Sequence, residues 1–503
     1  MAILRAFAVT VSLLLGACAA FPPAVPQQRE HLHAGAGSEE RACGEFFRRL
    51  DQAVSETGVG DAQDARVPGF PYLRSNRFLA GLSRDLDSSA AFEAWVDRLQ
   101  ALGDAGTGVE LANLPQSARQ RLIPFATGGD IPATARRCGE RLRARDLAHD
   151  DGRETLLRRA EIPPEYVIWQ RVAGLYPLTA LAFAAGIRNW QRETEEIFAR
   201  PLAELPRRGE LVRFSPPPRG EISGSRDVAE ILERSARNPL RIPEPGGADR
   251  ERLFAAFAPR FEVDVASSDD LIGTPVWRDA LPAVDVAVPT VYRHLSHALV
   301  AGRVLLQLNY IVWFPARTRV SSLDLLGGHF DGITWRVTLT PDGRPWVFDS
   351  MHNCGCYHLF FPTARARALP PPDTIDESAF VPQPAPDIRA GRGPVLRIEA
   401  RTHYLQRILP AATGEGREVR YRWADYDELR SLPAPDGARR SLFRPDGMVP
   451  GTERGERFLF WPMGIPNPGE MRQWGHHATA FVGWRHFDDA DLLEKAFAFA
   501  VAP

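Results

Sequence analysis

The chain has 503 residues, a formal net charge of −2, 44% hydrophobic residues and 25% charged residues. This balance excludes a disordered tail, a multi-pass membrane protein and a strongly basic nucleic-acid-binding protein. Of the 61 basic residues only Lys495 is a lysine, and the arginines are scattered among nearly equal numbers of acidic residues. We therefore expect the arginines mostly on the solvated surface, and we expect no nucleic acid among the partners.

Residues 1–17 have the pattern of a secretory signal peptide, with Arg5 at the positive end and an apolar run over residues 6–15. This run is too short to span a bilayer, which requires about 20 helical residues. The residues at its end, Leu15-Gly16-Ala17-Cys18, resemble the lipobox of bacterial lipoproteins. The resemblance implies that Cys18 becomes the first residue of the mature chain and carries acyl chains such as palmitate, so the membrane is an expected partner.

The residues after Cys18 indicate where the anchored chain resides. Ala19 follows the cysteine, whereas an aspartate there would resemble the inner-membrane retention signal of Gram-negative lipoproteins. The resemblance therefore favours the periplasmic face of the outer membrane. Residues 18–38 are rich in Pro, Ala, Gln and Gly without apolar periodicity, which predicts a flexible lipidated tether.

Residues 39–200 form the predicted helical N-terminal domain. Apolar side chains recur there at helical spacing, in Phe46, Phe47, Leu50 and Val54 and again in Phe92, Trp95, Val96 and Leu99. From Tyr166 to Phe198 the pattern predicts one or two helices interrupted at Pro177. The uncharged stretch 172–187 is shorter than a membrane span, so we expect a buried core helix, with contact to the membrane surface as the alternative.

Residues 201–225 combine proline, arginine and glycine without periodicity, which predicts a linker. Residues 226–503 then carry short apolar runs that predict strands at 261–265, 284–288, 305–314, 333–339, 346–349, 357–361, 395–400 and 418–423. Thr-Pro-Asp-Gly-Arg at 340–344 predicts a tight antiparallel hairpin. We expect one helix over 293–304 and a proline-rich surface loop over 362–394. The predicted fold class is α+β, a helical N-terminal domain followed by a mixed, largely antiparallel sheet domain.

Four cysteines remain once Cys18 is assigned to lipid. Cys43 and Cys138 each lie in a predicted helix of the N-terminal domain. In an oxidising periplasm they are expected to pair in a disulfide that closes a long loop, with two buried free thiols as the alternative.

The densest cluster of chemically active side chains lies at residues 349–358 and contains His352, Cys354, Cys356 and His358. Because an extended strand advances about 3.3 Å per residue, only a curled segment would close these four around one ion. Three interpretations stay open. The first is a zinc or copper site with His329 as a substitute ligand, the second a redox-active Cys354–Cys356 pair, and the third a structural role.

Secondary candidates flank this cluster. Asp331 and Asp349 lie near the predicted sheet edge, where two carboxylates would suit a hydrolase, and His476 and His477 form a pair near the C-terminus. The sequence contains no Gly-x-Ser-x-Gly and no His-Glu-x-x-His pattern, and no cysteine starts the helix expected near residue 293. A cysteine hydrolase is therefore not favoured.

These observations predict a lipid-anchored envelope protein that acts as a binding or structural component, because no complete catalytic pattern is present. The alternative is a metal-dependent or thiol-redox enzyme centred on His352, Cys354, Cys356 and His358.

Overall fold

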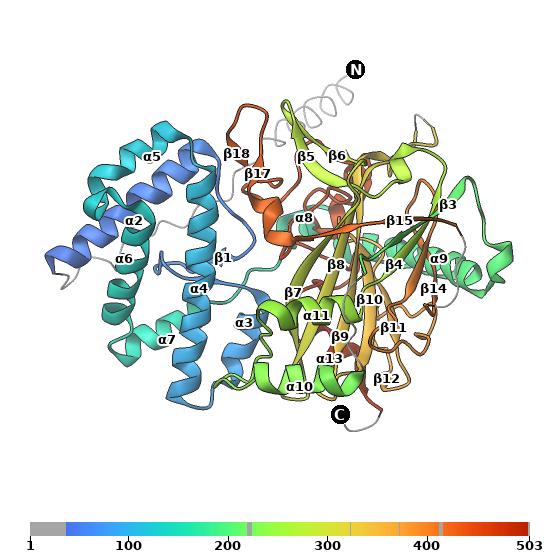
Figure 1. Ribbon diagram of the computed structural model, residues 1–503, viewed down its shortest axis with the longest axis horizontal. Coiled ribbons are helices and arrows are strands. Elements are labelled where there is room, and N and C mark those ends of the chain that lie inside the picture. The colour runs from blue at the N-terminus through green and yellow to red at the C-terminus, as the bar shows by residue number, and fades with distance from the viewer. Residues whose placement is uncertain (1–36, 219–223, 322, 372, 412–415, 501–503) are drawn as a thin grey trace, which may run out of the picture.

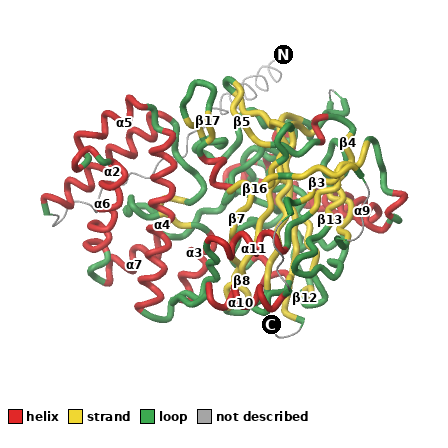
Figure 2. Tube along the Cα trace, viewed as in Figure 1, coloured by secondary structure: helices red, strands yellow, loops and turns green. Residues whose placement is uncertain are grey.

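The computed structural model describes residues 37–218, 224–321, 323–371, 373–411 and 416–500. Cys18 and the expected signal peptide lie outside the described residues, as does the expected tether up to residue 36. The N-terminal helices gather on one side of the molecule, and the sheets with the remaining helices lie on the other (Figures 1 and 2). The α+β class is confirmed, because most helices come from the N-terminal part and the sheets from the C-terminal part.

The N-terminal part is a bundle of helices around its own core. Its elements are α2 (Ser38–Thr57), β1 (Ala65–Arg66), β2 (Arg74–Ser75), α3 (Arg77–Leu82), α4 (Ser89–Asn113), α5 (Gln116–Leu122), α6 (Ile131–Asp146) and α7 (Asp150–Arg159). The Ser88 and Asp130 side chains cap α4 and α6 by accepting hydrogen bonds from backbone N–H groups of the first turn. The apolar positions that predicted these helices, Phe46 and Trp95 among them, are buried together.

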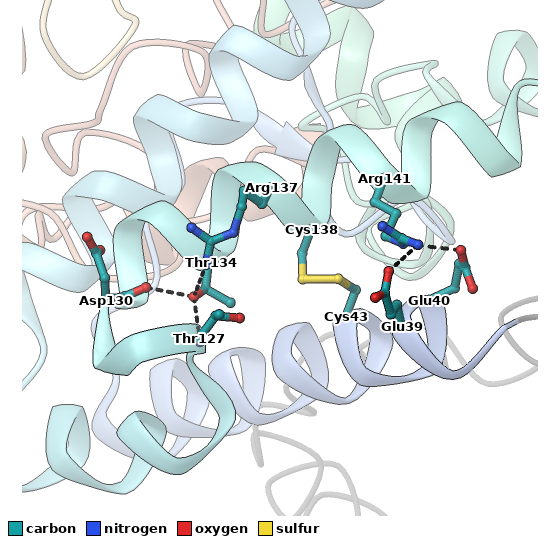
Figure 3. Close-up of a disulfide and its surroundings, with 9 residues drawn as sticks. All are labelled: Glu39, Glu40, Cys43, Thr127, Asp130, Thr134, Arg137, Cys138 and Arg141. Carbon is teal, nitrogen blue, oxygen red and sulfur yellow. Dashed lines mark hydrogen bonds and ion pairs between the residues drawn. A yellow bond between two sulfur atoms is a disulfide. The ribbon is translucent and has the colours of Figure 1, made fainter.

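A disulfide joins α2 to α6 (Figure 3). Cys43 and Cys138 are both buried, and their sulfur atoms lie 2.04 Å apart. One turn away Arg141 of α6 pairs with Glu39 and with Glu40 of α2, the latter at 3.2 Å. The predicted Cys43–Cys138 disulfide is confirmed.

Buried ion pairs connect the helical part to the C-terminal part. Arg74 Nη1 donates to Asp61 Oδ2 at 3.0 Å, and Arg74 Nη2 donates to Glu110 at 2.7 Å. Arg430, far along the chain, donates to Asp61 Oδ2 at 2.6 Å. All four side chains are buried, so each charge depends on its partners for compensation.

Two helices connect the bundle to the sheets, α8 (Ile168–Ala173) and α9 (Tyr176–Ala199), which confirms the predicted break near Pro177. Leu175 between them has a φ of 49°. The expected buried core helix is wrong. Over its first half α9 turns Ala180 and Ala184 toward the protein, whereas Leu178 is 68% and Leu181 55% exposed. Within the described residues no helix combines the length and apolar character needed to cross a membrane.

The C-terminal part contains two large sheets. The six-stranded sheet has the order β11-β10-β9-β8-β7-β16 and the five-stranded sheet the order β14-β13-β4-β3-β15. The strands of the first are β7 (Thr290–Val300), β8 (Arg303–Arg317), β9 (Gly328–Leu339), β10 (Pro345–His352), β11 (Leu359–Pro362) and β16 (Arg422–Asp425). Those of the second are β3 (Glu210–Ser215), β4 (Arg260–Val265), β13 (Val395–Ile398), β14 (Leu405–Leu409) and β15 (Arg417–Arg420).

β3 lies inside the segment 201–225 that was expected to be a linker. It pairs with β4 and β15, and its Val212 and Phe214 are buried in the main core. That part of the segment therefore belongs to the sheet rather than to a connection.

The hairpins of the six-stranded sheet test two local predictions. The predicted turn at 340–344 joins antiparallel β9 and β10, and Gly343 has the expected positive φ of 76°. The helix predicted over 293–304 is wrong, because this stretch forms β7, the turn Ala301–Gly302 and the start of β8. Both turn residues have positive φ, 50° and 70°, which suits a two-residue hairpin turn.

The main core lies between the two sheets and two covering helices, α10 (Ser225–Ser235) and α11 (Gly247–Ala256). One face of β8 enters this core, while Ile311 and Trp313 on its other face pack against the C-terminal segment. The remaining elements are β5 (Thr274–Arg278), β6 (Leu281–Asp285), β12 (Ala366–Ala368), β17 (Leu432–Pro433), β18 (Arg439–Arg440), α12 (Arg457–Phe460), α13 (Leu492–Ala496) and β19 (Phe497–Phe499).

Candidate functional site

Two adjoining cavities, of about 320 and 600 Å³, follow one side of α9. They share four lining residues, Trp190, Glu193, Tyr357 and Tyr404. The larger cavity begins at Ala182 and the smaller ends at Arg200. Because a helix rises about 1.5 Å per residue, the lined part of α9 is about 27 Å long. The segment after β10 lines both cavities, strand β14 completes the wall of the smaller one, and residues 456–485 supply much of the wall of the larger one.

A third cavity, of about 790 Å³, lies between the helical part and the β7–β8 hairpin. Its titratable lining residues, such as Asp85, Asp87 and Arg303, are exposed. Since it contains no buried ionisable group, the cavities along α9 are the better candidate site.

The segment from His352 to Tyr357 curls tightly after β10. The backbone N–H of Gly355 donates to the carbonyl of His352 at 2.7 Å, and that of His352 donates to the carbonyl of Cys356 at 3.0 Å. Gly355 has a φ of 93°, and a Cβ there would come within 2.6 Å of the Ala478 carbonyl oxygen. Position 355 therefore requires glycine. The segment has the curled shape that was expected to be necessary for His352, Cys354, Cys356 and His358 to surround one ion.

Alternating imidazoles and carboxylates extend inward from the smaller cavity. His352 lines that cavity, and its Nδ1 lies 3.4 Å from Asp331 Oδ1. Asp331 Oδ2 lies 2.8 Å from His403 Nδ1, and His403 Nε2 lies 3.3 Å from Asp270 Oδ1. All four side chains are buried, and the His403 ring stacks on Phe314 with centroids 3.9 Å apart.

The charges in this series follow from burial and from the neighbours. Burial opposes ionisation of Asp331, but His352 and His403 hold its pKa well below the usual value. Burial alone would lower the pKa of His403, but Asp270 and Asp331 outweigh it and raise that pKa. Burial lowers the pKa of His352 despite Asp331. The two carboxylates therefore favour the charged form of His403, whereas burial favours the neutral form of His352 at the cavity, which can accept a proton or hydrogen bond.

Two tyrosines and an arginine stand where the two cavities meet. Arg317 Nη2 donates to the Tyr404 hydroxyl at 3.0 Å, and its guanidinium lies 4.9 Å from the Tyr404 ring centroid. The Tyr357 ring lies 4.6 Å from Tyr404 and 4.9 Å from His352. Burial raises the pKa of both tyrosines, so their hydroxyls stay neutral. They give the apolar cavity a few fixed polar contacts.

Two glutamates line the larger cavity, a buried Glu456 and a partly buried Glu377. Burial raises the pKa of Glu456 to about 7, so this carboxyl is partly protonated at neutral pH. Burial also raises the pKa of Glu377, whose Oε1 accepts the backbone N–H of Val482 at 2.9 Å. A protonated carboxyl in an apolar cavity can donate a hydrogen bond to a ligand.

The two remaining cysteines also line the larger cavity. Cys354 and Cys356 are both free and buried. The pKa of Cys356 is raised well above its usual value, mainly by a hydrogen bond with Cys354 and secondly by burial. Cys356 is therefore a protonated thiol at neutral pH, and a thiol in that state is a weak nucleophile and a weak metal ligand.

The predicted ligands do not converge. His358 Nε2 lies 2.9 Å from Asp349 Oδ2, which also pairs with buried Arg336, whereas His352 faces Asp331. His329 lies elsewhere, with Nε2 2.7 Å from the carbonyl oxygen of Pro282. Among the described residues no three His, Cys, Asp or Glu side chains are grouped so as to hold a metal ion. The geometry gives no support to the zinc or copper interpretation.

The secondary candidates separate in the same way. His476 contacts two residues from the N-terminal part of the chain: its Nδ1 lies 3.0 Å from Glu165 Oε1, and its Nε2 lies 2.8 Å from the carbonyl oxygen of Ala62. His477 instead lies 3.2 Å from the carbonyl oxygen of Asn353. Asp331 belongs to the series at the smaller cavity, and Asp349 is enclosed with Arg336 and His358.

Sequence reasoning missed several residues of the site, among them His403, Tyr404, Arg317, Asp270 and Glu456. His403 and Tyr404 follow the strand predicted at 395–400, so a histidine and a tyrosine at a strand end were the available signal. The others gave none, because they come from separate turns and strand ends that only the fold brings together. Comparison with family models, with curated proteins and with solved structures finds no match to this chain, so its geometry carries the functional argument.

Proposed function

We propose that the chain is a lipid-anchored cell-envelope protein that binds an elongated, mainly apolar ligand along α9. The observation that carries the proposal is the pair of adjoining cavities that share Trp190, Tyr357 and Tyr404. Anchoring through Cys18 at the periplasmic face of the outer membrane is part of the proposal and rests on the lipobox resemblance.

The chemistry of the lining supports this class of ligand. Apolar and aromatic side chains such as Phe183, Ile187 and Phe380 line the larger cavity, as expected for a site that binds hydrophobic molecules. Buried polar groups also reach the lining, among them His352 at the smaller cavity and Glu456 at the larger. We expect these groups to orient a hydroxyl, carbonyl or carboxyl of the ligand.

A cavity-filling substitution tests the proposal. Gly186 of α9 lines the larger cavity, and a Cβ added there meets no atom within 4 Å, so Gly186→Phe has room to enter the cavity. Gly108 of α4 is an equally open, exposed helical glycine outside the cavities, so Gly108→Phe is the matched control. Both variants should keep the fold.

The readout is binding of a fluorescent apolar probe, N-phenyl-1-naphthylamine, to the chain from Ala19 to Pro503. We expect saturable binding that Gly186→Phe weakens about tenfold or more, equivalent to about 1.4 kcal/mol, and that Gly108→Phe leaves unchanged. Absence of saturable binding, or equal affinity in both variants, would contradict the proposal.

Thiol-redox chemistry is the second candidate, and its supporting observation is that Cys354 and Cys356 are both free beside a cavity. Forming a disulfide between them would release two electrons and two protons to an oxidant such as oxidised glutathione. A reversible midpoint in a glutathione titration, absent in Cys354→Ser, would support this function. Mass spectra showing both thiols unchanged over the whole series would exclude it.

A further inference from the structure

We infer that the exposed face of α8 and α9 lies in the surface of a lipid bilayer. This docking face consists of Ile168, Trp169, Val172, Leu175, Leu178 and Leu181, which are 55 to 71% exposed. The inference rests on the proposed function in one respect, the lipid anchor at Cys18.

The orientation of α8 and of the first turns of α9 is the reverse of that in an ordinary surface helix. A surface helix normally buries its large apolar residues and exposes polar ones. Here Ala180 and Ala184 face the protein, while Leu178 and Leu181 face outward one turn apart. A contiguous apolar surface of this kind marks an interaction site.

The docking face carries no exposed charge. Between residues 166 and 187 the only ionisable side chain of the Asp, Glu, Lys and Arg types is Arg171. Arg171 is buried, and it donates to the carbonyls of Met463 at 2.8 Å and Gly483 at 2.7 Å. A protein partner would ordinarily be met by polar groups at the rim of the interface, whereas lipid tails need none.

Aromatic side chains at the edge of the docking face also fit a bilayer surface. Trp169 is 65% exposed, and Trp484, which stacks on Arg171, is 50% exposed. On α12, which lies against α9 through a Phe183–Phe460 contact at 5.4 Å, Phe458 is 68% exposed. Tryptophan and phenylalanine are typical of helices that lie between headgroups and acyl chains.

The length of chain outside the structure allows this contact. Residues 19–36 separate Cys18 from Gly37, the first described residue. These 18 residues span at most about 60 Å when extended. An anchor of that length keeps the body within reach of the membrane that holds it, which raises the local concentration of lipid at the docking face. Since the larger cavity begins at Ala182, next to Leu181 of the docking face, docking also places that cavity near the lipid.

Vesicle binding without the anchor tests the inference. The chain from Ala19 to Pro503 contains every described residue and lacks Cys18, so it binds vesicles only through its own surface. We expect it to float with phosphatidylcholine vesicles, independently of salt because no cation lies on the docking face. Val172→Ser/Leu178→Ser should lower the partition coefficient about tenfold or more, because two apolar side chains leave the lipid.

The matched control is Leu281→Ser/Val288→Ser, which alters two similarly exposed residues, 50% and 40%, on and after β6. It should bind vesicles like the unchanged chain. In addition, brominated phosphatidylcholine should quench less fluorescence in Trp169→Phe than in the parent. The inference would be overturned if the chain did not float with vesicles, or if both double variants lost vesicle binding equally. It would also be overturned if sedimentation showed a dimer that the Val172/Leu178 variant abolishes. Probe binding without flotation would refute docking alone, and flotation without probe binding would refute the cavity function alone.

Discussion

Removing the Cys43–Cys138 disulfide should destabilise the protein more than removing two buried cysteine sulfur atoms that are not cross-linked. The bond closes a loop with a sequence separation of 95. In the chain-entropy model, a loop of this length contributes about 4.7 kcal/mol at 25 °C by restricting the unfolded chain. Measured contributions of disulfides are typically below this value, so we expect Cys43→Ala/Cys138→Ala to lose about 2 to 4 kcal/mol.

The assay is urea unfolding of the chain from Ala19 to Pro503, followed by far-ultraviolet circular dichroism. Cys354→Ala/Cys356→Ala is the matched control, because it also removes two buried sulfur atoms but no cross-link. The control should lose less, and dithiothreitol should shift the parent to the midpoint of the Cys43/Cys138 variant. Equal losses in the two double variants would refute the reasoning from loop closure.

Three further predictions concern buried charge and strain. Arg336→Met removes the charged partner of buried Asp349 and leaves it the neutral imidazole of His358, so thermal unfolding should show a loss of about 3 to 5 kcal/mol, and Arg336→Met/Asp349→Asn should lose less. Burial lowers the pKa of His477 to about 3, so its neutral form stabilises the fold above the unfolded pKa near 6.5 and this stability is lost as pH falls toward 3. Urea midpoints between pH 6.5 and 4 should therefore fall less in His477→Gln, and an identical pH slope would contradict this. Leu175 has a φ of 49° and is 62% exposed. Asparagine adopts positive φ more readily than leucine, so Leu175→Asn should raise the free energy of unfolding by about 1 kcal/mol and should also reduce vesicle flotation. A less stable Leu175→Asn variant would contradict the assignment of strain.

The strands were predictable where apolar runs are long and bounded by turns, as at β8 and β9. The error at β7 has a physical cause. Leu295, Ala298 and Leu299 fit a helical spacing as well as a strand, and the turn that decides the matter depends on Ala301 taking a positive φ beside Gly302. Local pattern does not distinguish the two, because pairing with β8 determines the outcome.

The candidate site was predictable only in part. His352 and Asp331 were candidates from composition, and both belong to the series at the smaller cavity. Their partner His403 lies 72 residues from Asp331 in sequence, and its role depends on β13 and β14 closing beside β9. The outward apolar face of α9 was misjudged because hydropathy gives the period of a helix but not the side that meets the protein.

The buried Asp61 has a consequence for the order of folding. Its partner Arg430 lies 369 residues later in the chain, so during synthesis from the N-terminus the Asp61–Arg430 pair can form only after most of the protein has been made. Until then Arg74 alone compensates its charge, and the face of the bundle around it stays open to water. The Cys43–Cys138 bond needs only the first part of the chain, so it can close early and hold the bundle together through that interval. Once this bond has formed, Cys43 and Cys138 are no longer free to pair with Cys354 or Cys356, which come later in the chain.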